Sequence, residues 1–442
     1  MPRRAFGAGF AFGLGLFGVG VSWIYISMNQ FGGVPAVFAG IATAAFCAFL
    51  ALFPACAGWL QARIPAPPAV RVCLLVPAAL TLAEWLRSWI FTGFPWLAAG
   101  YSATGWPLQG YAPLVGVFGL SFAVFSLAGM LWLVARRHFV FLIPVVALFG
   151  AGQLLRGVDW TAPQGTPVET ALLQGNIPQD LKFTPERYGR TLETYARLAE
   201  GTGAKLIVLP ETALPRFLDL IDPAYIARLE SAARRNAGDI LVGVPMRVSG
   251  GDYYNSVVSL GTSQRQAYHK VHLVPFGEFV PPAFAWTLRF AQIPLGDFSR
   301  GAAAQPALGV AGQRVAINVC YEDVFGDEMA RRAPDATLLV NVSNVAWFGD
   351  SLAPGQHLQI ARLRAVETGR MHLAATNTGI TAAIDRDGRV VARLPQFTEG
   401  RLEVQAQGYS GATPYMRVLD WPAVLVSLAI LAVAVFAARR SR

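Results

Sequence analysis

Two apolar segments of the chain end in residues that suit nucleophilic chemistry. The segment RVAINVC (314–320) ends in Cys320, and KLIVLPE (205–211) ends in Glu211. A thiol needs a neighbouring base to attack an ester at neutral pH, and a carboxylate can be that base. The stretch AYHKVHLVPFGE adds Lys270, whose positive charge can stabilise the oxyanion of a tetrahedral intermediate. These residue types together are suited to nucleophilic catalysis by a thiol.

The expected position of Cys320 and Glu211 at the ends of strands supports that interpretation. Both segments are apolar and rich in β-branched residues, which predicts buried β-strands. Open α/β folds place their active sites at the carboxyl ends of such strands. A lone buried charge is costly unless it has a partner, so we expect a cation or a hydrogen-bond donor next to Glu211.

Cysteine usage leaves two interpretations of Cys320 open. Cys47, Cys56 and Cys73 lie in or beside segments apolar enough to span a membrane, so Cys320 has no disulfide partner in the middle of the chain. An unpaired thiol in an oxidising compartment normally has a use. A buried free cysteine is also a common small core residue, and spacing alone does not separate the two interpretations.

The middle of the chain alternates strand-like and helix-like segments. Seven segments have the length and β-branched content of strands: 168–177, 205–211, 239–245, 253–260, 314–320, 336–344 and 371–384. Amphipathic helices are predicted between several of them, over 186–203, 224–238 and 355–370. The alternation predicts an α/β domain over 156–420, and a domain of about 250 residues is large enough to bury its own core.

The chain as a whole is too apolar for an ordinary soluble protein. Its 442 residues are 54% hydrophobic and 14% charged, with a mean hydropathy of +0.42. A helix needs ~20 apolar residues to cross a bilayer. We therefore expect an N-terminal membrane domain of about five helices over 1–155, and a last span with a basic tail over 421–442. The predicted spans are 6–28, 36–60, 72–91, 113–134, 139–155 and 421–438.

The placement of arginines predicts the orientation of these spans, because positive residues in short loops stay in the cytoplasm. With six spans, all the basic clusters fall on one side: Arg3 and Arg4, Arg63 and Arg71, Arg136 and Arg137, and Arg439, Arg440 and Arg442. The connecting segments MNQFGGVPA and 91–113 carry no charge. Both termini are therefore expected in the cytoplasm, and the region 156–420 is expected outside it.

Several motifs together resemble a known family. LPE around Glu211, HKVHLVPFGE around Lys270 and NVCYED around Cys320 resemble the Glu-Lys-Cys triad of the nitrilase superfamily, whose fold is an αββα sandwich. With the membrane helices, further motifs are similar to the apolipoprotein N-acyltransferase family: LLQGNIPQDLKF, FSRG, NVSNVAWFGDS, APGQHLQIARLRAVETGR and TNTGITA. The resemblance covers essentially the whole chain. It implies a multi-span α-helical membrane domain joined to a nitrilase-like α/β sandwich domain, in a bacterial inner membrane with the catalytic domain on the periplasmic side.

The resemblance also implies a reaction and its partners. Cys320 would take an acyl chain from a membrane phospholipid as a thioester. The N-terminal amine of a diacylglyceryl-cysteine on an apolipoprotein would then accept the chain as an amide. Glu211 would be the general base, and Lys270 would face the oxyanion. No cofactor and no metal are implied, and a monomer is expected to suffice.

Further residues match family positions or lie beside them. Three are expected to support the triad: Glu278, Glu322 and Tyr321. Each also has a purely structural alternative: Glu278 could only brace the Lys270 loop, and Tyr321 could be a packing residue. Asp323, directly after Glu322, has no role that the sequence predicts. Three aromatics are expected to contact an acyl chain or a loop, because amphipathic rings suit a membrane interface: Phe183, Trp347 and Phe348. As a class, such aromatics are more often core than contact residues.

The chain departs from the family at a few places. The family usually has tryptophan where Phe183 stands and aspartate where Val345 stands, so the resemblance does not predict the lid or loop contacts at these two places. The first predicted span corresponds to the third of eight family spans. Two N-terminal helices are therefore expected either to be absent or to be encoded upstream of this start.

Other functions have weaker support. A membrane-tethered amidase acting on a small amide would share the triad but would not need so many spans, and an inactive scaffold would not need a complete triad.

The net charge of +9 includes several topology arginines, and no basic run with interleaved aromatics predicts nucleic-acid binding. His269 and His272 lack the spacing of a zinc site. Gly13, Gly15 and Gly18 spell G-x-G-x-x-G inside a predicted span, which favours close helix packing over a dinucleotide site.

Overall fold

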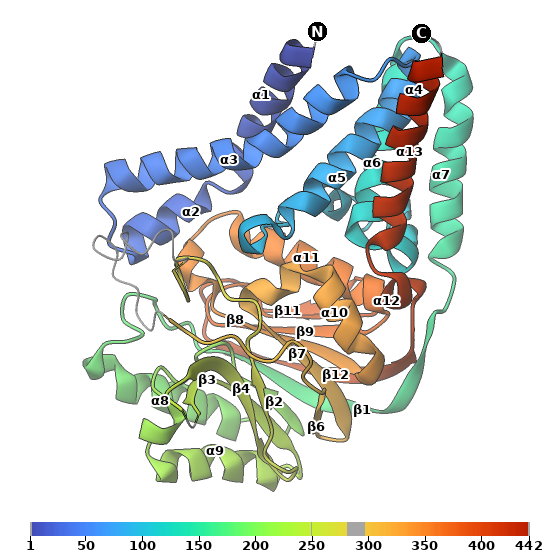
Figure 1. Ribbon diagram of the computed structural model, residues 1–442. Coiled ribbons are helices and arrows are strands. Elements are labelled where there is room, and N and C mark those ends of the chain that lie inside the picture. The colour runs from blue at the N-terminus through green and yellow to red at the C-terminus, as the bar shows by residue number, and fades with distance from the viewer. Residues whose placement is uncertain (1, 249, 281–296, 441–442) are drawn as a thin grey trace.

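The computed structural model describes residues 2–248, 250–280 and 297–440. Long helices gather at one end of the molecule, and two β-sheets lie at the other end (Figure 1). Both termini of the chain and the short helix α4 (Pro68–Val70) lie at the end of the helical part that is far from the sheets.

The helical part is built from both ends of the chain. Its helices are α1 (Pro2–Gly20), α2 (Trp23–Ile26), α3 (Ala36–Ala62), α4 (Pro68–Val70), α5 (Val76–Arg87), α6 (Ala112–Ala135), α7 (Leu142–Leu155) and α13 (Trp421–Arg440). Short π-helical turns lie at Ser27–Phe31 and Arg71–Leu75. The connection from α5 to α6 is long and contains the 3-10 turns Ile90–Thr92, Ala99–Ala103 and Pro107–Tyr111.

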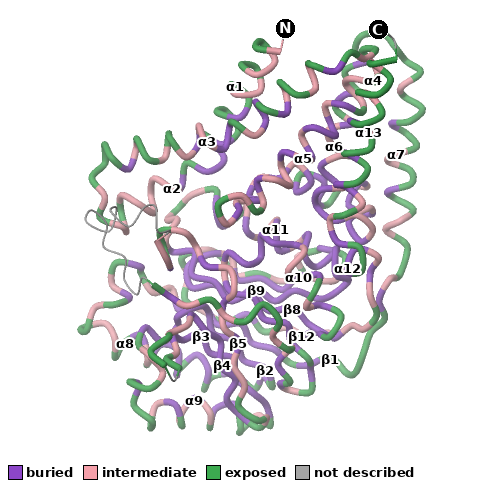
Figure 2. Tube along the Cα trace, in the orientation of Figure 1, coloured by how far each residue is buried: buried purple, intermediate pink, exposed green. Residues whose placement is uncertain are grey.

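The surface of the helical part exposes large apolar side chains. Figure 2 shows exposed residues along α1, α3, α7 and α13, whereas the strands at the centre of the sheets are buried. On α13 the exposed side chains include Leu425, Val426, Val433 and Phe436. Soluble proteins rarely expose contiguous apolar surface of this extent, so these helices fit a lipid environment.

The predicted spans correspond to helices of the structure, with two differences. Among the described residues, four helices are long and apolar enough to cross a membrane: Ala36–Ala62, Pro68–Arg87, Pro107–Ala135 and Trp421–Arg440. The predicted span 6–28 is a pair of helices, Pro2–Gly20 and Trp23–Phe31, bent by 50°, which adds a fifth span if the pair crosses as one. The predicted span 139–155 is a shorter apolar helix, Phe139–Leu155. The prediction of a multi-span helical domain is confirmed, although its first and fifth spans are not straight helices of full length.

Gly13 accounts for the close approach of α1 to α3. A Cβ atom at Gly13 would lie 2.7 Å from Cα of Ala51 and 2.8 Å from Cγ of Pro54, so a larger residue would push the helices apart. A Cβ atom at Gly15 or Gly18 would meet no described atom within 4 Å. The predicted close helix packing therefore holds for Gly13 and is wrong for Gly15 and Gly18.

Two six-stranded sheets form the other part of the molecule. The first has the order β12-β1-β2-β3-β4-β5. Its strands are β1 (Thr161–Gln174), β2 (Leu206–Val208), β3 (Asp239–Arg247), β4 (Tyr253–Gly261), β5 (Ala267–His269) and β12 (Gly400–Gly411). The second has the order β11-β10-β9-β8-β7-β6. Its strands are β6 (Leu308–Val310), β7 (Gln313–Val319), β8 (Leu338–Ser343), β9 (Met371–Thr376), β10 (Ala382–Ile384) and β11 (Val390–Arg393). In each sheet three neighbouring strands are parallel, β1-β2-β3 and β7-β8-β9, so their carboxyl ends share an edge.

The two sheets pack face to face around an aliphatic core. Buried side chains of both sheets meet there, among them Leu172, Leu206, Val257, Val315, Ile317 and Val340. Helices α8 (Pro185–Glu200) and α9 (Pro223–Arg235) pack on the outer face of the first sheet. Helices α10 (Gly326–Arg332) and α11 (Ala353–Thr368) pack on the outer face of the second, and α12 (Pro414–Val418) leads into α13. The four layers confirm the predicted αββα sandwich.

Most of the predicted elements of the sandwich are present, with two kinds of error. The predicted single strand 371–384 is wrong, because the chain turns after Thr376 and pairs back as the antiparallel strands β9 and β10. Strands β5, β6, β11 and β12 were not predicted. For β12, the alternation of Leu402, Val404 and Ala406 was a usable signal, since Leu402 and Ala406 are buried against the core.

Candidate active site

Three of the predicted residues follow strand ends that meet on one side of the sandwich. Glu211 comes shortly after β2, Lys270 directly follows β5, and Cys320 directly follows β7. Lys270 Nζ lies 3.5 Å from Glu211 Oε1, and the charges of both residues act on the Cys320 thiol. Since β2 and β5 belong to the first sheet and β7 to the second, the site is built across the sandwich.

The buried carboxylate of Glu211 receives hydrogen bonds on both oxygens. Asn255 Nδ2 donates to Oε1 at 2.7 Å, and the backbone N–H of Asn344 donates to Oε2 at 2.8 Å. Burial by itself would raise the pKa of Glu211, but Lys270, Asn255 and Lys182 outweigh burial and hold the pKa below its usual value. Glu211 is therefore an anion at neutral pH and can accept a proton.

Lys270 is paired with a second carboxylate, that of Glu278. Lys270 Nζ lies 2.9 Å from Glu278 Oε1 and 2.8 Å from Oε2. Glu278 Oε2 also accepts from the backbone N–H of Val274 at 2.8 Å, which holds the turn that follows Lys270. Burial would lower the pKa of Lys270, but Glu278 and Glu211 raise it above its usual value. The ammonium therefore stays charged, and Glu278 both contacts it and braces its loop.

Asn255 belongs to this site although the sequence did not predict it. Its Nδ2 atom donates to Oε1 of Glu211 and to Oε1 of Glu278, in both cases at 2.7 Å. The backbone carbonyl oxygen of Asn255 accepts from the backbone N–H of Lys270 at 2.8 Å. Asn255 lies within β4, where an amide in the middle of YYNSVVSL is the only signal that the sequence offers. The amide holds the two carboxylates in place around Lys270.

Cys320 occupies a strained turn between β7 and a short helix. It begins the 3-10 helix η9 (Cys320–Val324) with a φ of +53°, a conformation that is costly for any residue except glycine. Its carbonyl oxygen accepts from Asn341 Nδ2 at 3.2 Å, which ties the turn to β8. Cys320 is free, as the sequence predicts. Burial, and then the carboxylates of Glu211 and Glu278, raise the pKa of its thiol well above the usual value. The resting site therefore holds a neutral thiol beside an ionised carboxylate.

Glu322 joins the segment that carries Lys270 to the strand that carries Cys320. Its carboxylate accepts hydrogen bonds from the backbone N–H groups of Val319 (2.7 Å), Val271 (2.7 Å) and His272 (3.1 Å) and from the hydroxyl of Tyr268 (2.9 Å). Val319 immediately precedes Cys320, and Val271 immediately follows Lys270. Glu322 therefore fixes the position of Cys320 relative to Lys270.

Asp323 has different partners from those of its neighbour. Its Oδ1 accepts from Asn318 Nδ2 at 2.7 Å and lies 3.0 Å from His372 Nε2, and its Oδ2 lies 3.5 Å from His357 Nε2. Burial would raise the pKa of Asp323, but the two histidines and Asn318 outweigh burial and lower it. The sequence predicts no role for this residue. In the structure it anchors η9 to β7, β9 and α11.

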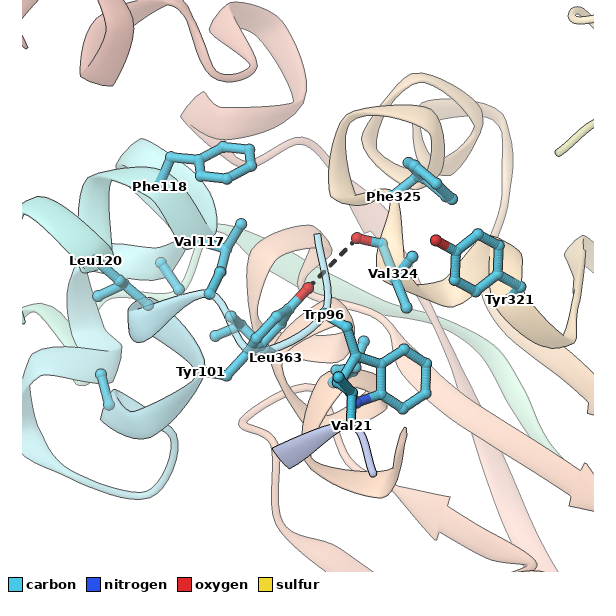
Figure 3. Packing of buried hydrophobic residues seen from close by; sticks show 14 of the residues in the cluster. Val21, Trp96, Tyr101, Val117, Phe118, Leu120, Tyr321, Val324, Phe325 and Leu363 are labelled. Atoms are coloured by element: carbon cyan, nitrogen blue, oxygen red, sulfur yellow. Dashed lines mark hydrogen bonds between the residues drawn. The ribbon is translucent and has the colours of Figure 1, made fainter. Parts of the chain in front are cut away.

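The turn η9 also packs against the helical part of the molecule. The hydroxyl of Tyr101 donates to the carbonyl of Val324 at 3.3 Å (Figure 3), and the hydroxyl of Tyr321 donates to the carbonyl of Gly93 at 2.9 Å. Tyr321 and Val324 belong to the same buried apolar cluster as Trp96. Gly93, Trp96 and Tyr101 all lie in the uncharged connection between α5 and α6. Cys320, which begins this turn, therefore lies where the sandwich meets the helical part of the molecule.

The three aromatics predicted to contact substrate lie at two places. The ring centroids of Phe348 and Trp23 are 4.5 Å apart, and those of Trp347 and Phe31 are 6.2 Å apart. Both therefore contact the bent helix pair at the N-terminus. Phe183 is 37% exposed and lies on the loop before α8. A role of these rings in binding substrate stays a prediction.

The two histidines near Lys270, His269 and His272, contact polar groups of the protein. In the described parts of the chain, no cluster of three or more His, Cys, Asp or Glu residues could hold a metal ion. His269 Nδ1 lies 2.8 Å from Ser256 Oγ. His272 Nδ1 lies 3.0 Å from Glu328 Oε1, and its Nε2 donates to the carbonyl of Thr92 at 2.7 Å. His272 is thus a further link between the sandwich and the connection from α5 to α6.

The sandwich and its site define a protein of the carbon-nitrogen hydrolase class that carries membrane helices. Residues 169–415 match the family model described as carbon-nitrogen hydrolase, and residues 1–130 match that of the apolipoprotein N-acyltransferase N-terminal domain. A solved structure of a CN-hydrolase superfamily protein from Xanthomonas campestris is 19% identical, with a TM-score of 0.43; the similarity covers 59% of this chain and 97% of that chain.

Relatives in sequence narrow this class to one family. An apolipoprotein N-acyltransferase from Nitrosomonas europaea is 48% identical, over 94% of this chain and 85% of the relative. Another from Methylococcus capsulatus is 46% identical, over 99% of this chain and 88% of the relative. The chain belongs to the apolipoprotein N-acyltransferase family.

Proposed function

We propose that this protein transfers an acyl chain from a membrane phospholipid, through a thioester on Cys320, to the N-terminal amine of a diacylglyceryl-cysteine in apolipoproteins. The names of its close relatives support the activity. One observation carries the mechanism: the ionised carboxylate of Glu211, 3.5 Å from Lys270 Nζ, acts on the buried thiol of Cys320, and the turn that Cys320 begins packs against the helical part.

The first half-reaction forms the thioester. Glu211 takes the proton of the Cys320 thiol, and the sulfur attacks the ester carbonyl carbon of the phospholipid. A carbon–sulfur bond forms, and the negative charge that develops on the carbonyl oxygen is stabilised by Lys270 and a backbone N–H near Cys320. The carbon–oxygen bond then breaks, Glu211 returns its proton to the leaving oxygen, and lysophospholipid departs.

The second half-reaction forms the amide in a ping-pong sequence. The acceptor amine attacks the thioester carbonyl carbon, a carbon–nitrogen bond forms, and Glu211 accepts a proton from the nitrogen. The carbon–sulfur bond breaks and the proton passes to the sulfur, which restores the thiol. A thioester retains enough free energy for this step, provided that water is excluded. The packing of η9 against apolar residues of the helical part supports such exclusion.

The remaining predicted residues are assigned by their contacts. Glu278 and Glu322 are positioning residues for Lys270, and Tyr321 positions η9 on the connection from α5 to α6. The last three are proposed to line the path of the lipid: Phe183, Trp347 and Phe348. A single chain supplies every group named here, which supports a monomer as the working unit.

The region 156–420 is proposed to be a periplasmic catalytic domain, held in the inner membrane by the helices of 1–155 and 421–442. The arginine clusters support this orientation, and both termini lie at the end of the helical part far from the sheets (Figure 1). A membrane-impermeant thiol reagent added to spheroplasts should label Ser231→Cys, on α9, and should not label Arg137→Cys. The reverse pattern would contradict the orientation.

The reaction is tested with purified protein and phospholipid alone. We expect a hydroxylamine-sensitive thioester on Cys320 with release of lysophospholipid, and a triacylated product after a diacylated lipopeptide is added. Cys320→Ala should form no thioester. Cys56→Ala removes an exposed free cysteine of the helical part and serves as the matched control. An acyl-enzyme that persists in Cys320→Ala, or its absence from the native protein, would contradict the proposal.

A small-amide hydrolase is the alternative that the same experiment addresses. The match of residues 1–130 to an acyltransferase domain favours the transferase. Hydrolysis of simple amides without any lipid-derived thioester would favour the amidase instead.

A further inference from the structure

A second buried lysine, Lys182, lies at the active site. The chain contains only three lysines among its 36 basic residues: Lys182, Lys205 and Lys270. Lys205 is exposed, whereas Lys182 and Lys270 are 2% and 1% exposed. Burying an ammonium is costly unless it meets an acceptor or an anion, so its presence at this point requires a partner.

The partner of Lys182 is the segment that carries Glu211. Among the described contacts, Lys182 Nζ donates one hydrogen bond, to the carbonyl oxygen of Glu211 at 3.2 Å. The loop of Lys182 is itself held in place, because Gln179 Oε1 accepts from Asn344 Nδ2 at 2.7 Å. The backbone N–H of Asn344 in turn donates to the Glu211 carboxylate. Lys182 is therefore fixed beside the proposed base by a closed set of hydrogen bonds.

The count of buried charges shows why a second cation is needed. Two carboxylates, Glu211 and Glu278, share the single ammonium of Lys270, and all three residues are buried. These three alone leave one uncompensated negative charge in a desolvated site. With Lys182 charged, the four groups are neutral in sum while Cys320 is a neutral thiol. After a proton passes from Cys320 to Glu211, the thiolate of Cys320 takes over the negative charge of Glu211, so the five groups together still sum to zero.

We propose that Lys182 is a positioning residue that acts through its charge: it supplies the second positive charge of the site and thereby keeps the pair of Glu211 and Cys320 able to ionise near neutral pH. The inference deepens the proposed function and rests on it for its role in catalysis. The charge effect itself concerns only the reactivity of the thiol.

The electrostatic surroundings of Lys182 agree with this role. The groups whose charges act on it are Glu211 and Cys320, while Lys270 contacts the carboxylate of Glu211 and Glu278 contacts Lys270. Burial lowers the pKa of Lys182 to about 8, and Glu211 and Cys320 oppose that shift. Lys182 is therefore charged at neutral pH and loses its charge under mildly alkaline conditions. Arginine would keep the charge there, because its guanidinium does not deprotonate in proteins.

The test measures the rate at which Cys320 of the full-length protein is alkylated by iodoacetamide, a small neutral reagent, between pH 5 and pH 10. Peptide mass spectrometry follows Cys320 separately from the other cysteines. Removing a nearby cation raises the pKa values of acidic groups, so we expect Lys182→Met to shift the whole rising profile to higher pH by about one unit or more. Alkylation at neutral pH should then slow about tenfold.

Two further variants make the result specific to charge. Lys182→Arg should follow the native profile near neutral pH and should react faster than the native protein above pH 8, where Lys182 loses its proton. Lys205→Met removes an exposed lysine and should leave the profile unchanged. A native profile in Lys182→Met, or equal shifts in Lys182→Met and Lys182→Arg, would overturn the proposal. If Lys182→Met does not fold, equal rates of Lys182→Arg and native protein above pH 8 would overturn it.

Because the readout needs no lipid, it separates this inference from the acyltransferase proposal. Thioester formation from phospholipid is measured in parallel on the same samples. Absence of a thioester from the native protein together with the expected alkylation shifts would contradict the transferase alone. A thioester in the native protein without any alkylation shift in the variants would contradict the role of Lys182 alone.

Discussion

The two sides of Cys320 differ in chemistry. On one side lie buried charges from the first sheet and its loops, which meet through hydrogen bonds of 2.7–2.9 Å around Lys270 and Asn255. On the other side lies the turn η9, whose Tyr321 and Val324 pack against Trp96 and Tyr101 of the helical part. The first side is built from charge and hydrogen bonds, and the second mainly from apolar contact.

This difference separates reactivity from access to lipid. The charged side sets the protonation of the thiol, because every group on it changes the energy of an anion at Cys320 or Glu211. The apolar side sets where the thiol lies relative to the membrane helices. Substitutions on the charged side should therefore impair Cys320 toward any reagent, whereas those on the apolar side should impair it toward phospholipid only.

Glu211→Gln should have the largest effect on the charged side. The amide keeps the shape of the side chain but cannot take the thiol proton, so we expect thioester formation to fall by ~10²-fold or more. Thioester yield over time is the measurement, with the far-ultraviolet circular dichroism of the variant as a check of folding. Glu186→Gln, at an exposed residue of α8, is the matched control. Near-native thioester formation in Glu211→Gln would assign the base to another group.

Asn255→Leu should come next. The change removes the amide that donates to both Glu211 and Glu278, and an unsatisfied buried partner costs about 1–3 kcal/mol. We expect acylation and alkylation of Cys320 to slow together, by about tenfold. Asn236→Leu is the control, because Asn236 also donates two hydrogen bonds, to the carbonyls of Thr202 and Ala204 away from the site. Equal losses of activity in the two variants would show a general loss of stability.

Two residues that the sequence predicted, Cys320 and Glu211, have a local signature. Cys320 and Glu211 each follow an apolar segment directly, and that pattern can be recognised without knowing the fold. Asn255 and Lys182 carry no such signature. Each becomes part of the site only because β4 and the loop before α8 bring it to Glu211, across 44 and 29 positions of sequence. Strand β5 was missed because three residues are too few for a periodic pattern.

The two acidic residues after Cys320 show the same limit. Glu322 and Asp323 are adjacent in sequence, yet Glu322 binds the backbone on either side of the site, while Asp323 lies between His372 and Asn318. The tight 3-10 turn separates the two side chains. A sequence can show that acids are present, but their partners depend on the backbone conformation of that turn.

Tyr321→Phe should affect the apolar side selectively. The change removes one hydrogen bond, from the tyrosine hydroxyl to the carbonyl of Gly93, and keeps the ring. A neutral hydrogen bond contributes about 1 kcal/mol, so we expect acylation by phospholipid to slow about threefold to tenfold. Alkylation of Cys320 by iodoacetamide should stay native. Tyr225→Phe is the control, since its hydroxyl donates to the carbonyl of Leu192 on the outer face of the first sheet. If alkylation slowed as much as acylation, the two sides of Cys320 would not be separable.

The smallest expected effect concerns the dependence of stability on pH. The pKa of Glu211 lies below its usual value of about 4.3 in the folded protein. Glu211 therefore contributes stability that is fully present above that usual value and is lost as the pH falls through the lower, folded value. Tyr321 and Val324 on the apolar side carry no group that titrates in this range.

The thermal midpoint of the native protein, measured in detergent from pH 6 down to pH 3, should consequently fall more steeply than that of Glu211→Gln, by a few degrees over the range. Tyr321→Phe should keep the native slope, because it removes no acid. A native slope in Glu211→Gln would mean that the hydrogen bonds from Asn255 and Asn344 hold the neutral and the ionised carboxyl equally well. The charged side would then be organised by geometry rather than by charge.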